Sequence, residues 1–481
     1  MKEYDIVIIG TGSAMNLVDP VIQERPEVRI AVIDKDEPGG ICLTRGCIPS
    51  KILLYPAELV RSLEDGTELG ISARVQVDFS FVMDRMRRLI GTDIDSIRRG
   101  LSNSKNIDYY HAPAEFVSPY TLSVAGETIT GKMFLLCTGS QPVIPDIKGL
   151  AQTDYLTSDT VLGLTKLPRS MVIIGGGYIA AEYGHFFASM GSEVTVLGRN
   201  PQFLPEEEPE VSRVVKKDLE RHMKIFTNSE VIEVSGSNPK AVMARDRVTG
   251  KTTTFQAESI MVAAGRQSTS GILHPERAGI RVDGRGWIEV NDYLETSQPN
   301  VWALGDADGR YLFKHVANYE SQVVYYNAVL KRPTRVDYHA VPHAVFTYPE
   351  VAAVGMTEKA ALASVDPEDV LIGFHRYQDT AKGQAMNAKD YFVKVLIQGS
   401  TMRILGAHIV GPHASVLLQE IVNAMYTEGE TAEVVGKAMH IHPALSEVVE
   451  RAFTSLYPPS QYHHMLMHAG LEEGEHEHFH H

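Results

Sequence analysis

Two of the three cysteines in this 481-residue chain, Cys42 and Cys47, lie five positions apart in the segment "GGICLTRGCIPSK" (39–51). A pair this close can act in redox chemistry, bind a metal ion or remain as two inert buried thiols. Zinc is disfavoured, because no second cysteine pair and no histidine follows within the next dozen positions. Three cysteines also cannot build the disulfide framework of a small secreted protein.

The spacing of the pair limits the backbone around it. In a regular helix, residues five apart are separated by a rise of about 7.5 Å, beyond the usual Cα separation of a disulfide. If the pair is bridged, the segment is therefore not regular helix throughout. Gly46 gives the freedom for such a distortion, and Pro49 suits the first turn of a following helix. A helix N-terminus lowers the pKa of a nearby thiol, so the pattern favours a redox-active pair.

The elements that would position this pair begin near the N-terminus. "YDIVIIGTGSAMN" (4–16) is an apolar strand followed by Gly10-x-Gly12, and a second strand, "VRIAVID", ends at Asp34. This order is typical of a dinucleotide-binding βαβ unit, in which glycines admit the pyrophosphate and the carboxylate binds a ribose. Met15 replaces the third glycine, so the motif alone is a weak signal.

A second unit of the same kind follows at 171–199, "MVIIGGGYIAAEYGHFFASMGSEVTVLGR". It repeats strand, Gly175-x-Gly177-x-x-Ala180, helix and strand. Two units predict two dinucleotides, one a flavin and the other a nicotinamide, because hydride must pass between them. Where an NAD-binding unit carries its ribose-binding carboxylate this chain has a glycine followed by Arg199, which favours a 2′-phosphate and thus NADPH.

Composition sets the broad class of protein. A chain of 481 residues predicts two to four domains, and 44% apolar residues are ordinary for a globular protein. The net charge of −15 disfavours a nucleic-acid partner. No apolar stretch approaches the roughly 18 residues needed to span a membrane, and the chain begins without a basic leader, so we expect a cytoplasmic protein.

Taken together, the motifs resemble the class I pyridine nucleotide-disulfide oxidoreductases, which include dihydrolipoamide dehydrogenases and mycothione reductases. The resemblance covers about residues 4–457. The cysteine segment is similar to the family's redox-disulfide signature, from which Thr44 and Arg45 depart. Further segments resemble the connecting strands, the second flavin motif and the start of the dimerisation domain: "LLCTGSQPVIP" (135–145), "MVAAGRQSTSG" (261–271), "VWALGDADG" (301–309) and "VPHAVFTYPEVAAVGMTE" (341–358).

The resemblance implies a route for electrons. Cys47 is expected against the flavin ring, and Cys42 would exchange with the substrate disulfide. In "HIHPALSEVVE", His442 and Glu447 fall on the family's His-Pro-x-x-x-Glu pattern, where the histidine handles the proton and the carboxylate orients it. In family members this histidine comes from the second subunit, so a homodimer is implied.

Three further catalytic and gating residues are implied in the same way. Lys51 and Glu182 correspond to an ion pair beside the reactive flavin nitrogen, where a cation would stabilise the reduced ring. Tyr178 corresponds to an aromatic gate over the nicotinamide pocket. No metal ligand is expected. The residues expected to bind the two cofactors, FAD and NADPH (or NADH), are Gly10, Gly12, Ser13, Asp34, Lys35, Gly40, Ala114, Thr138, Gly139, Gly175, Gly177, Tyr178, Ile179, Arg199, Gly265, Gly305 and Asp306.

The substrate stays open between two enzymes. No cysteine follows Cys137, which disfavours mercuric reductases and high-molecular-weight thioredoxin reductases, while the redox pair disfavours soluble transhydrogenases. Dihydrolipoamide dehydrogenase is the commoner identity for such sequences, and any lipoyl carrier would be a separate protein. Arg199 and the segments "GTGSAMN" and "FKHVANYESQVV" favour an NADPH-dependent reductase of a small disulfide, such as mycothione reductase. A non-enzymatic, metal-handling flavoprotein is the alternative from another class.

The expected architecture is α/β, with two Rossmann-like dinucleotide-binding domains and a C-terminal α+β dimerisation domain. We expect the FAD-binding domain at 1–150 and 270–335, with the NAD(P)-binding domain inserted at 151–269. The interface domain would occupy 336–460. The tail, 461–481, carries seven histidines and is expected to be disordered. His185 and His315 are expected to be structural, and Cys137 is expected to line a buried strand, with no further role indicated by the sequence.

Overall fold

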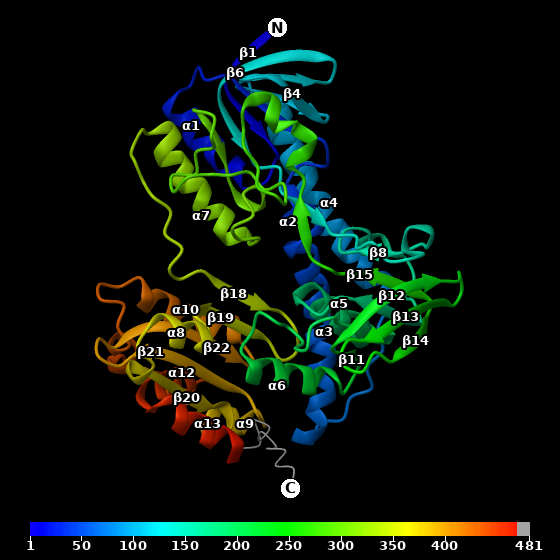
Figure 1. Ribbon diagram of the computed structural model, residues 1–481, viewed down its shortest axis with the longest axis vertical. Helices are drawn as coiled ribbons and strands as arrows, with labels where there is room; N and C mark the ends of the chain where they lie inside the picture. The colour runs from blue at the N-terminus through cyan, green and yellow to red at the C-terminus, as the bar shows by residue number, and fades with distance from the viewer. Residues whose placement is uncertain (469–481) are drawn as a thin grey trace.

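The computed structural model describes residues 1–468, and its three largest sheets organise it into three units (Figure 1). The N-terminal unit is a seven-stranded sheet of order β3-β2-β1-β6-β5-β4, with β17 paired to β6. Strands β1, β2, β3, β6 and β17 pair in parallel, while β4 and β5 are antiparallel. These strands are β1 Lys2–Ile9, β2 Ile30–Asp34, β3 Ile107–His111, β4 Ala114–Ser118, β5 Thr121–Val124, β6 Glu127–Leu136 and β17 Val301–Ala303.

Strand β1 is buried on both faces, as its near-continuous apolar sequence predicts for the centre of a parallel sheet. Because side chains alternate along a strand, Ile6 and Ile8 enter one core and Val7 and Ile9 the other. The helices of this unit are η1 Ser13–Leu17, α1 Val18–Glu24, α2 Gly40–Arg45, α3 Cys47–Asp65, η2 Gly66–Leu69, α4 Phe79–Asn103, η5 Ser270–Leu273, η6 Pro275–Ala278, η7 Gly305–Ala307, α7 Lys314–Val324 and the π-helix η8 Tyr325–Val329.

The middle unit is a five-stranded parallel sheet of order β11-β10-β9-β15-β8, flanked by a three-stranded antiparallel sheet, β12-β13-β14. Its strands are β8 Leu156–Thr157, β9 Ser170–Ile174, β10 Glu193–Leu197, β11 Lys224–Phe226, β12 Ser229–Ser235, β13 Lys240–Asp246, β14 Thr252–Ala257 and β15 Ser259–Val262. Its helices are η3 Leu150–Gln152, η4 Thr160–Gly163, α5 Tyr178–Met190 and α6 Pro209–Leu219. A short antiparallel pair, β7 Ser140–Pro142 and β16 Arg266–Ser268, joins it to the N-terminal unit.

Helix α5 decides where the middle unit meets the redox motif. Most of its residues are buried, and it packs against α3, the helix that begins at Cys47. The lower half of α3 and α5 lie side by side in Figure 1. Side chains at the start of α3 therefore face side chains at the start of α5.

The C-terminal unit is a six-stranded antiparallel sheet of order β18-β19-β22-β21-β20-β23. Helices α10 and α12 cover one face with apolar side chains. Its strands are β18 Pro342–Val345, β19 Val351–Gly355, β20 Val370–Arg376, β21 Phe392–Gln398, β22 Arg403–Val410 and β23 Leu456–Tyr457. Its helices are α8 Glu358–Ser364, η9 Pro367–Asp369, η10 Tyr377–Asp379, α9 Ala381–Ala385, α10 Ala414–Met425, α11 Glu433–Lys437, α12 Ser446–Thr454 and α13 Pro459–His468.

A buried charge cluster ties the middle unit to this sheet. Lys394 on β21 is fully buried, and its Nζ lies 2.6 Å from Glu208, 2.6 Å from Glu210 and 2.7 Å from Glu358. These carboxylates are the one group of three potential metal ligands found among residues 1–468, and the lysine occupies it. Removing the lysine or a carboxylate from such a cluster leaves buried charge without its partner, which destabilises the fold. The contact therefore fixes α6 against the C-terminal sheet.

The C-terminal tail corrects one expectation. Residues 461–468 were expected to be disordered with the rest of the tail, but they belong to helix α13. Tyr462 is fully buried and donates a hydrogen bond to Glu210 at 2.7 Å, which anchors the helix. The remaining tail, 469–481, lies outside the described residues. Within 1–468, no helix has the length and apolar character required to traverse a bilayer.

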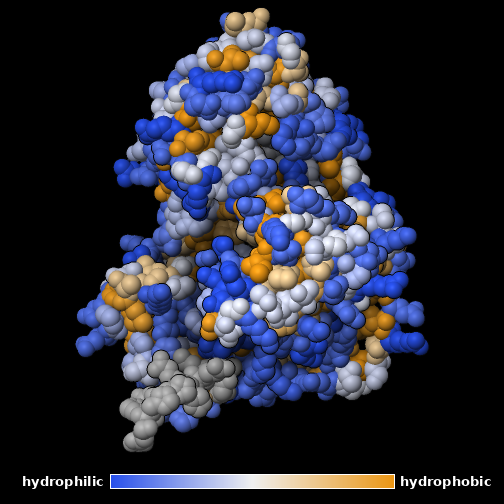
Figure 2. Space-filling view, turned by 45° about the vertical axis from the view of Figure 1, so that its right-hand side comes forward, coloured by the Kyte–Doolittle hydropathy of each residue, from blue (hydrophilic) through white to orange (hydrophobic). Residues whose placement is uncertain are grey.

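The surface is polar over most of the face in Figure 2, and apolar side chains gather beside a hollow in its middle. The three units surround the residues of the large cavity described below, whose lining comes from residues 9 to 344. The fold thus brings distant parts of the chain to one site.

Candidate redox site and dinucleotide pockets

The two cysteines lie at a break between helices. Helix α2 ends at Arg45, Gly46 adopts φ −127° and ψ −120°, and α3 begins at Cys47. A Cβ on Gly46 would lie 2.9 Å from the carbonyl oxygen of Ile41, so the close approach of the two helices needs glycine. The sequence predicted that this segment is not continuous helix if the pair is bridged, and the structure interrupts the helix at Gly46. Both cysteines are free thiols in the structure, and they share a hydrogen bond.

That hydrogen bond makes the two thiols unequal. The bond from Cys47 lowers the pKa of Cys42 to about 7, and the cation of Lys314 contributes in the same direction against the effect of burial. The same bond raises the pKa of Cys47. Because the thiolate is the nucleophile, Cys42 is the member of the pair suited to attack a substrate disulfide at neutral pH.

Lys314 was not predicted from the sequence. It is the first residue of α7, and its Nζ lies 2.8 Å from the hydroxyl of Ser13 in the first glycine-rich turn. Its segment, "FKHVANYESQVV", stood out in the sequence only as a family resemblance. No motif revealed that its cation would act on the thiol of Cys42.

Lys51 and Glu182 form the ion pair that the sequence predicted. Lys51 Nζ is 2.8 Å from each Glu182 carboxylate oxygen, and the pair links α3 to α5. The backbone N–H of Phe346 donates to Glu182 at 3.0 Å, and Lys51 Nζ lies 4.6 Å from the centre of the Phe346 ring. These contacts hold the ammonium one helical turn from Cys47.

A cavity of about 570 Å³ runs past the redox pair, within the size range of cofactor pockets. It contains most of the residues predicted to act on or bind the cofactors. Those that line it are Gly10, Gly12, Ser13, Asp34, Lys35, Gly40, Cys42, Cys47, Lys51, Ala114, Thr138, Gly139, Tyr178, Ile179, Glu182, Gly305 and Asp306. Gly175, Gly177, Arg199, Gly265, His442 and Glu447 lie outside its lining.

The first glycine-rich turn forms one end of this cavity. Gly10 has φ +100°, and a Cβ there would lie 2.1 Å from the carbonyl oxygen of Cys137. Asp34 accepts hydrogen bonds from the N–H and hydroxyl of Thr11, at 2.8 and 2.5 Å, and so braces the turn from the end of β2. The exposed backbone, the carboxylate and the cavity volume fit the FAD that the resemblance implies.

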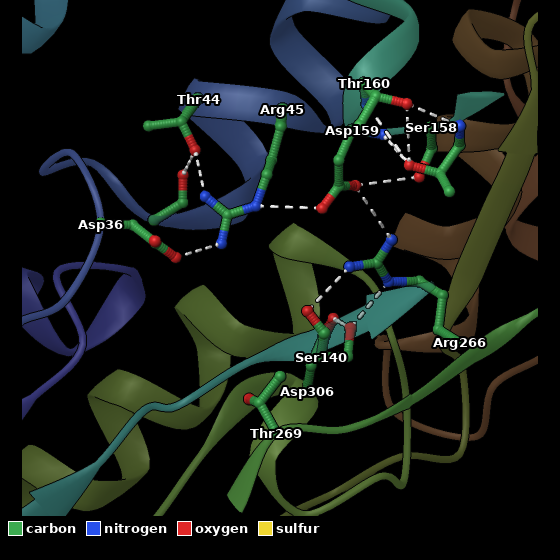
Figure 3. A network of polar contacts seen from close by, with 12 residues as sticks. Asp36, Thr44, Arg45, Ser140, Ser158, Asp159, Thr160, Arg266, Thr269 and Asp306 are labelled. Atoms are coloured by element: carbon green, nitrogen blue, oxygen red, sulfur yellow. Dashed lines mark hydrogen bonds and ion pairs between the residues drawn. The ribbon is translucent and has the colours of Figure 1, made fainter. Parts of the chain in front are cut away.

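Arg45, where the chain departs from the family signature, joins an ion-pair network (Figure 3). Its guanidinium lies 2.8 Å from Asp36, which follows β2, and 3.3 Å from Asp159, which follows β8. The side chain thus ties the end of α2 to the wall of the cavity and to the middle unit. The sequence marked Arg45 as unusual but gave no partner for it.

Arg266 holds the aspartate of the second flavin motif through a serine. Its Nε and Nη2 donate to the hydroxyl and carbonyl of Ser140, at 2.7 and 2.9 Å. The Ser140 hydroxyl then donates to Asp306 at 2.5 Å (Figure 3). Burial raises the pKa of Asp306, and the hydrogen bond from Ser140 opposes this shift. The arrangement fixes the carboxylate at the cavity surface, where it can accept a hydrogen bond from a ligand.

The second glycine-rich turn repeats the first. Gly175 has φ +140°, and a Cβ there would lie 2.1 Å from the carbonyl oxygen of Ala263. Arg199 is exposed after β10, and its carbonyl accepts a hydrogen bond from Arg247 at 3.0 Å. Arg247, in the turn between β13 and β14, is a second cation beside Arg199 that sequence reasoning missed.

His442 and Glu447 are paired as predicted, 2.9 Å apart between Nδ1 and Oε1. The hydrogen bond from His442 lowers the pKa of Glu447. Two thirds of the His442 side chain is exposed, at 67%, and it is not part of the cavity in its own chain. The neighbouring His440, for which the sequence gave no role, contacts Glu420 at 3.1 Å.

His185 and His315, which were expected to be structural, and Cys137, whose role the sequence left open, have structural surroundings. Burial lowers the pKa of His185 to about 3, so its ring is neutral. Burial raises the pKa of Cys137 to about 11, which makes this thiol a poor nucleophile. The ring nitrogen Nε2 of His315 lies 2.8 Å from the carbonyl oxygen of Pro342.

The fold and the site define a class of protein: an oxidoreductase with two dinucleotide-binding units and a cysteine pair at the junction of helices α2 and α3. Comparison with family models identifies the class. Residues 4–321 match the pyridine nucleotide-disulphide oxidoreductase model, and 341–453 match the dimerisation domain of the same proteins. The chain therefore belongs to the pyridine nucleotide-disulphide oxidoreductases, flavin-dependent enzymes that use FAD and NAD(P)H.

Individual relatives agree with this assignment. The chain is 35% identical to the mycothione reductase of Mycobacterium tuberculosis over 469 residues, covering 95% of this chain and 100% of the relative. It is 32% identical to the dihydrolipoyl dehydrogenase of Chlamydia trachomatis, over 93% of this chain and 95% of that one.

A solved structure matches the fold over nearly the whole chain. The HOCl-induced flavoprotein disulfide reductase RclA of Escherichia coli superposes with a TM-score of 0.83 at 28% identity. The match covers 94% of this chain and 99% of RclA. Together with the family match, these relatives confirm the expected α/β fold and FAD-dependent NAD(P)H:disulfide oxidoreductase activity.

Proposed function

We propose that this protein is an NADPH-dependent reductase of a low-molecular-weight disulfide. The observation that carries the proposal is the end of β10, where Gly198 replaces the ribose-binding carboxylate of NAD-binding units and Arg199 stands beside Arg247. Two exposed guanidinium groups at this position suit the 2′-phosphate of NADPH. The similarity to mycothione reductase along the whole relative supports the same substrate class.

The thiols would act in a fixed order. When bound, FAD would supply the passage of an electron pair from the nicotinamide to the Cys42–Cys47 disulfide. The Cys42 thiolate would then attack the substrate disulfide, forming a mixed disulfide and releasing one thiolate, which takes a proton from His442. Attack by Cys47 on the Cys42 sulfur would break the mixed disulfide, release the second thiol and restore the pair.

Lys51 and Glu182 would act on the flavin side of the pair. The ammonium of Lys51, held by both oxygens of Glu182, would stabilise negative charge on a reduced ring bound beside Cys47. Ser140 and Arg266 would orient Asp306 toward the ribityl chain. Within this proposal, 1–150 and 270–335 form the FAD-binding domain, 151–269 the NAD(P)-binding domain and 336–460 the interface domain.

The proton donor would come from a second subunit. His442 is exposed, and it is flanked by the apolar residues Met439 and Ile441, which are 101% and 76% exposed. Apolar side chains this exposed are typical of an interface. We propose that the homodimer places the paired His442 and Glu447 of one subunit against the cysteine pair of the other, in a reducing, cytoplasmic compartment.

A substrate panel tests the proposal. Lipoamide, coenzyme A disulfide, glutathione disulfide and bis-γ-glutamylcystine would each be assayed with NADPH and with NADH. We expect turnover of at least one of the last three with NADPH. Turnover of lipoamide alone, with NADH preferred, would instead establish a dihydrolipoyl dehydrogenase, the second candidate that the Chlamydia trachomatis relative favours.

A metal-handling role is the candidate from another class, and one structural neighbour was solved as a Cu(II) complex. Among residues 1–468, the single three-carboxylate group is filled by Lys394, which gives this role little support. Anaerobic reduction separates the candidates. An enzyme should develop a long-wavelength thiolate-to-flavin absorbance band, and a protein whose cysteines do not exchange electrons with flavin should not.

A further inference from the structure

Four aromatic rings stack in a row that crosses all three units. Tyr178, the gate residue at the start of α5, stacks on His343 of β18, with ring centres 5.6 Å apart and planes at 20°. His343 stacks on Phe313, at 6.0 Å and 4°. Phe313, which precedes α7, stacks on His315 at 5.4 Å and 11°. The row joins the nicotinamide side of the cavity to the C-terminal sheet and the N-terminal unit.

The buried carboxylate of Glu207 orients the His343 ring. Its Nε2 lies 2.8 Å from Glu207 Oε1, and the Glu207 side chain is fully buried while that of His343 is 20% exposed. The other carboxylate oxygen of Glu207 is buried without a hydrogen-bond partner among the described residues. His343 thus lies at hydrogen-bond distance from this carboxylate, and the Tyr178 side chain interacts with the same carboxylate.

Both ends of the Glu207–His343 contact are themselves held in place. Glu208, the next residue after Glu207, is bound by the buried Lys394 at 2.6 Å. His343 pairs with Ala353 in the ladder between β18 and β19. The His343 end of the stack thus rests on a rigid base. Tyr178, by contrast, follows Gly177, where a Cβ added to the glycine would have no neighbouring atom within 4 Å.

In the gate role that the family resemblance implies, the Tyr178 ring would fill the space that a nicotinamide enters. Tyr178 lines the cavity together with Cys47, Lys51 and Glu182, the residues of the flavin side. A nicotinamide ring can approach this wall only when the tyrosine ring moves aside. Any contact that stabilises the ring in its observed position therefore lowers the fraction of protein that is competent to bind.

We propose that His343, oriented by Glu207, is a positioning residue that holds the Tyr178 ring closed over the nicotinamide pocket. The inference rests on the nicotinamide site of the proposed function. It gives the gate a specific latch: the Tyr178–His343 stack must break for the nucleotide to bind. Stacked aromatic pairs of this kind change an equilibrium about 2- to 10-fold.

A double-mutant cycle on the FAD-loaded dimer tests the latch. The Kd of NADP⁺ would be measured from the perturbation of flavin absorbance in the wild type, His343→Ala, Tyr178→Ala and the double variant. We expect His343→Ala to tighten NADP⁺ binding about 3- to 10-fold, because the gate opens at lower cost. In the Tyr178→Ala background, the same substitution should change the Kd less than about twofold.

Two further variants separate stacking from general disturbance. His315→Ala removes the far ring of the row without touching Tyr178, and it should leave the Kd unchanged. His343→Phe keeps a ring but loses the Glu207 hydrogen bond, and it should give a Kd between those of the wild type and His343→Ala. A Kd for His343→Phe equal to that of the wild type would overturn the role of Glu207.

The outcomes are distinct from a failure of the proposed function. If neither NADPH nor NADH reduces the flavin, the proposed function fails. If the flavin is reduced but His343→Ala changes the Kd equally in both backgrounds, the latch is wrong. Weaker NADP⁺ binding in His343→Ala would also overturn it, because the histidine would then contact the nucleotide itself.

Discussion

The two glycine-rich turns of this protein are alike at their first glycine and differ at the next two positions. Gly10 and Gly175 both have positive φ, and a Cβ on either would lie 2.1 Å from a backbone carbonyl oxygen of the neighbouring strand. At the second glycine, a Cβ on Gly12 would lie 3.3 Å from the Cys137 sulfur, whereas one on Gly177 would meet nothing within 4 Å.

The third position also differs. Met15 lies in the short 3₁₀-helix η1, while Ala180 is fully buried in the regular helix α5. The larger side chain, that of Met15, thus occurs where the first turn is followed by a short 3₁₀-helix and not by a regular α-helix. The comparison teaches that the first glycine is required by the packing of the protein itself. The second is required mainly by the nucleotide, and the third depends on how closely helix and strand pack.

The largest effect is expected from alanine at the first glycine of either turn. Gly10→Ala should destabilise the fold by about 2 to 4 kcal/mol and yield protein without flavin, because a Cβ cannot fit against the strand. Gly175→Ala should keep its FAD but lose reduction of the flavin by NADPH. The flavin-to-protein ratio and stopped-flow reduction measure the two results. Full flavin content in Gly10→Ala would contradict the claim that the packing of the protein requires the first glycine of both turns.

The next effect concerns the residues that distinguish the two nucleotides. Arg199→Ala should weaken NADPH binding about 10- to 100-fold, the usual loss for a charge-assisted hydrogen bond to phosphate, with little change for NADH. Arg247→Ala should show a smaller change in the same direction. Lys251→Ala, in the same turn region, is the matched control. Equal losses for both nucleotides in Arg199→Ala would contradict a 2′-phosphate site.

A smaller effect separates the second glycines. Gly12→Ala should lower the free energy of unfolding of the apoprotein by about 1 kcal/mol, since its Cβ crowds the Cys137 sulfur. Gly177→Ala should leave the stability of the ligand-free protein unchanged and weaken only nicotinamide binding. Chemical denaturation and nucleotide titration measure the pair. Equal destabilisation by both substitutions would show that the two second glycines do not differ in their packing against the protein.

The third position is expected to give effects no larger than those at the second, and the smallest of all in Met15→Leu. Ala180→Gly should cost about 1 kcal/mol, the intrinsic penalty for glycine inside a helix. Met15→Leu should cost less than about 1 kcal/mol, because a side chain of similar volume fills the same partly buried site. Thermal unfolding of the two variants compares them. A larger loss in Met15→Leu would show that the first turn packs as tightly as the second.

The sequence predicted the parts of the site that local patterns encode. The cysteine pair, both glycine-rich turns and the strands on either side of each turn follow from spacing and from runs of apolar residues. The break at Gly46 followed from the geometry of residues five apart. The Lys51–Glu182 pair, 131 positions apart in sequence, was predicted only because the family resemblance supplied it.

The residues that sequence reasoning missed depend on tertiary packing. Lys314, Arg247 and Glu207 act on groups more than 45 positions away, and no local pattern marks them. The start of α13 was missed for a related reason. Residues 461–468 look like a polar tail, and their helix is anchored by Tyr462 against Glu210, far from it in the sequence.

The central claim is that electrons leave the flavin through the cysteine pair. An anaerobic dithionite titration of the FAD-loaded enzyme counts the electron pairs that each variant accepts. The account predicts two pairs for the wild type, one in the thiols and one in the flavin, and a single pair for Cys42→Ser and for Cys47→Ser, with no turnover of any disulfide. Two pairs in either variant, or unaltered disulfide turnover, would contradict it.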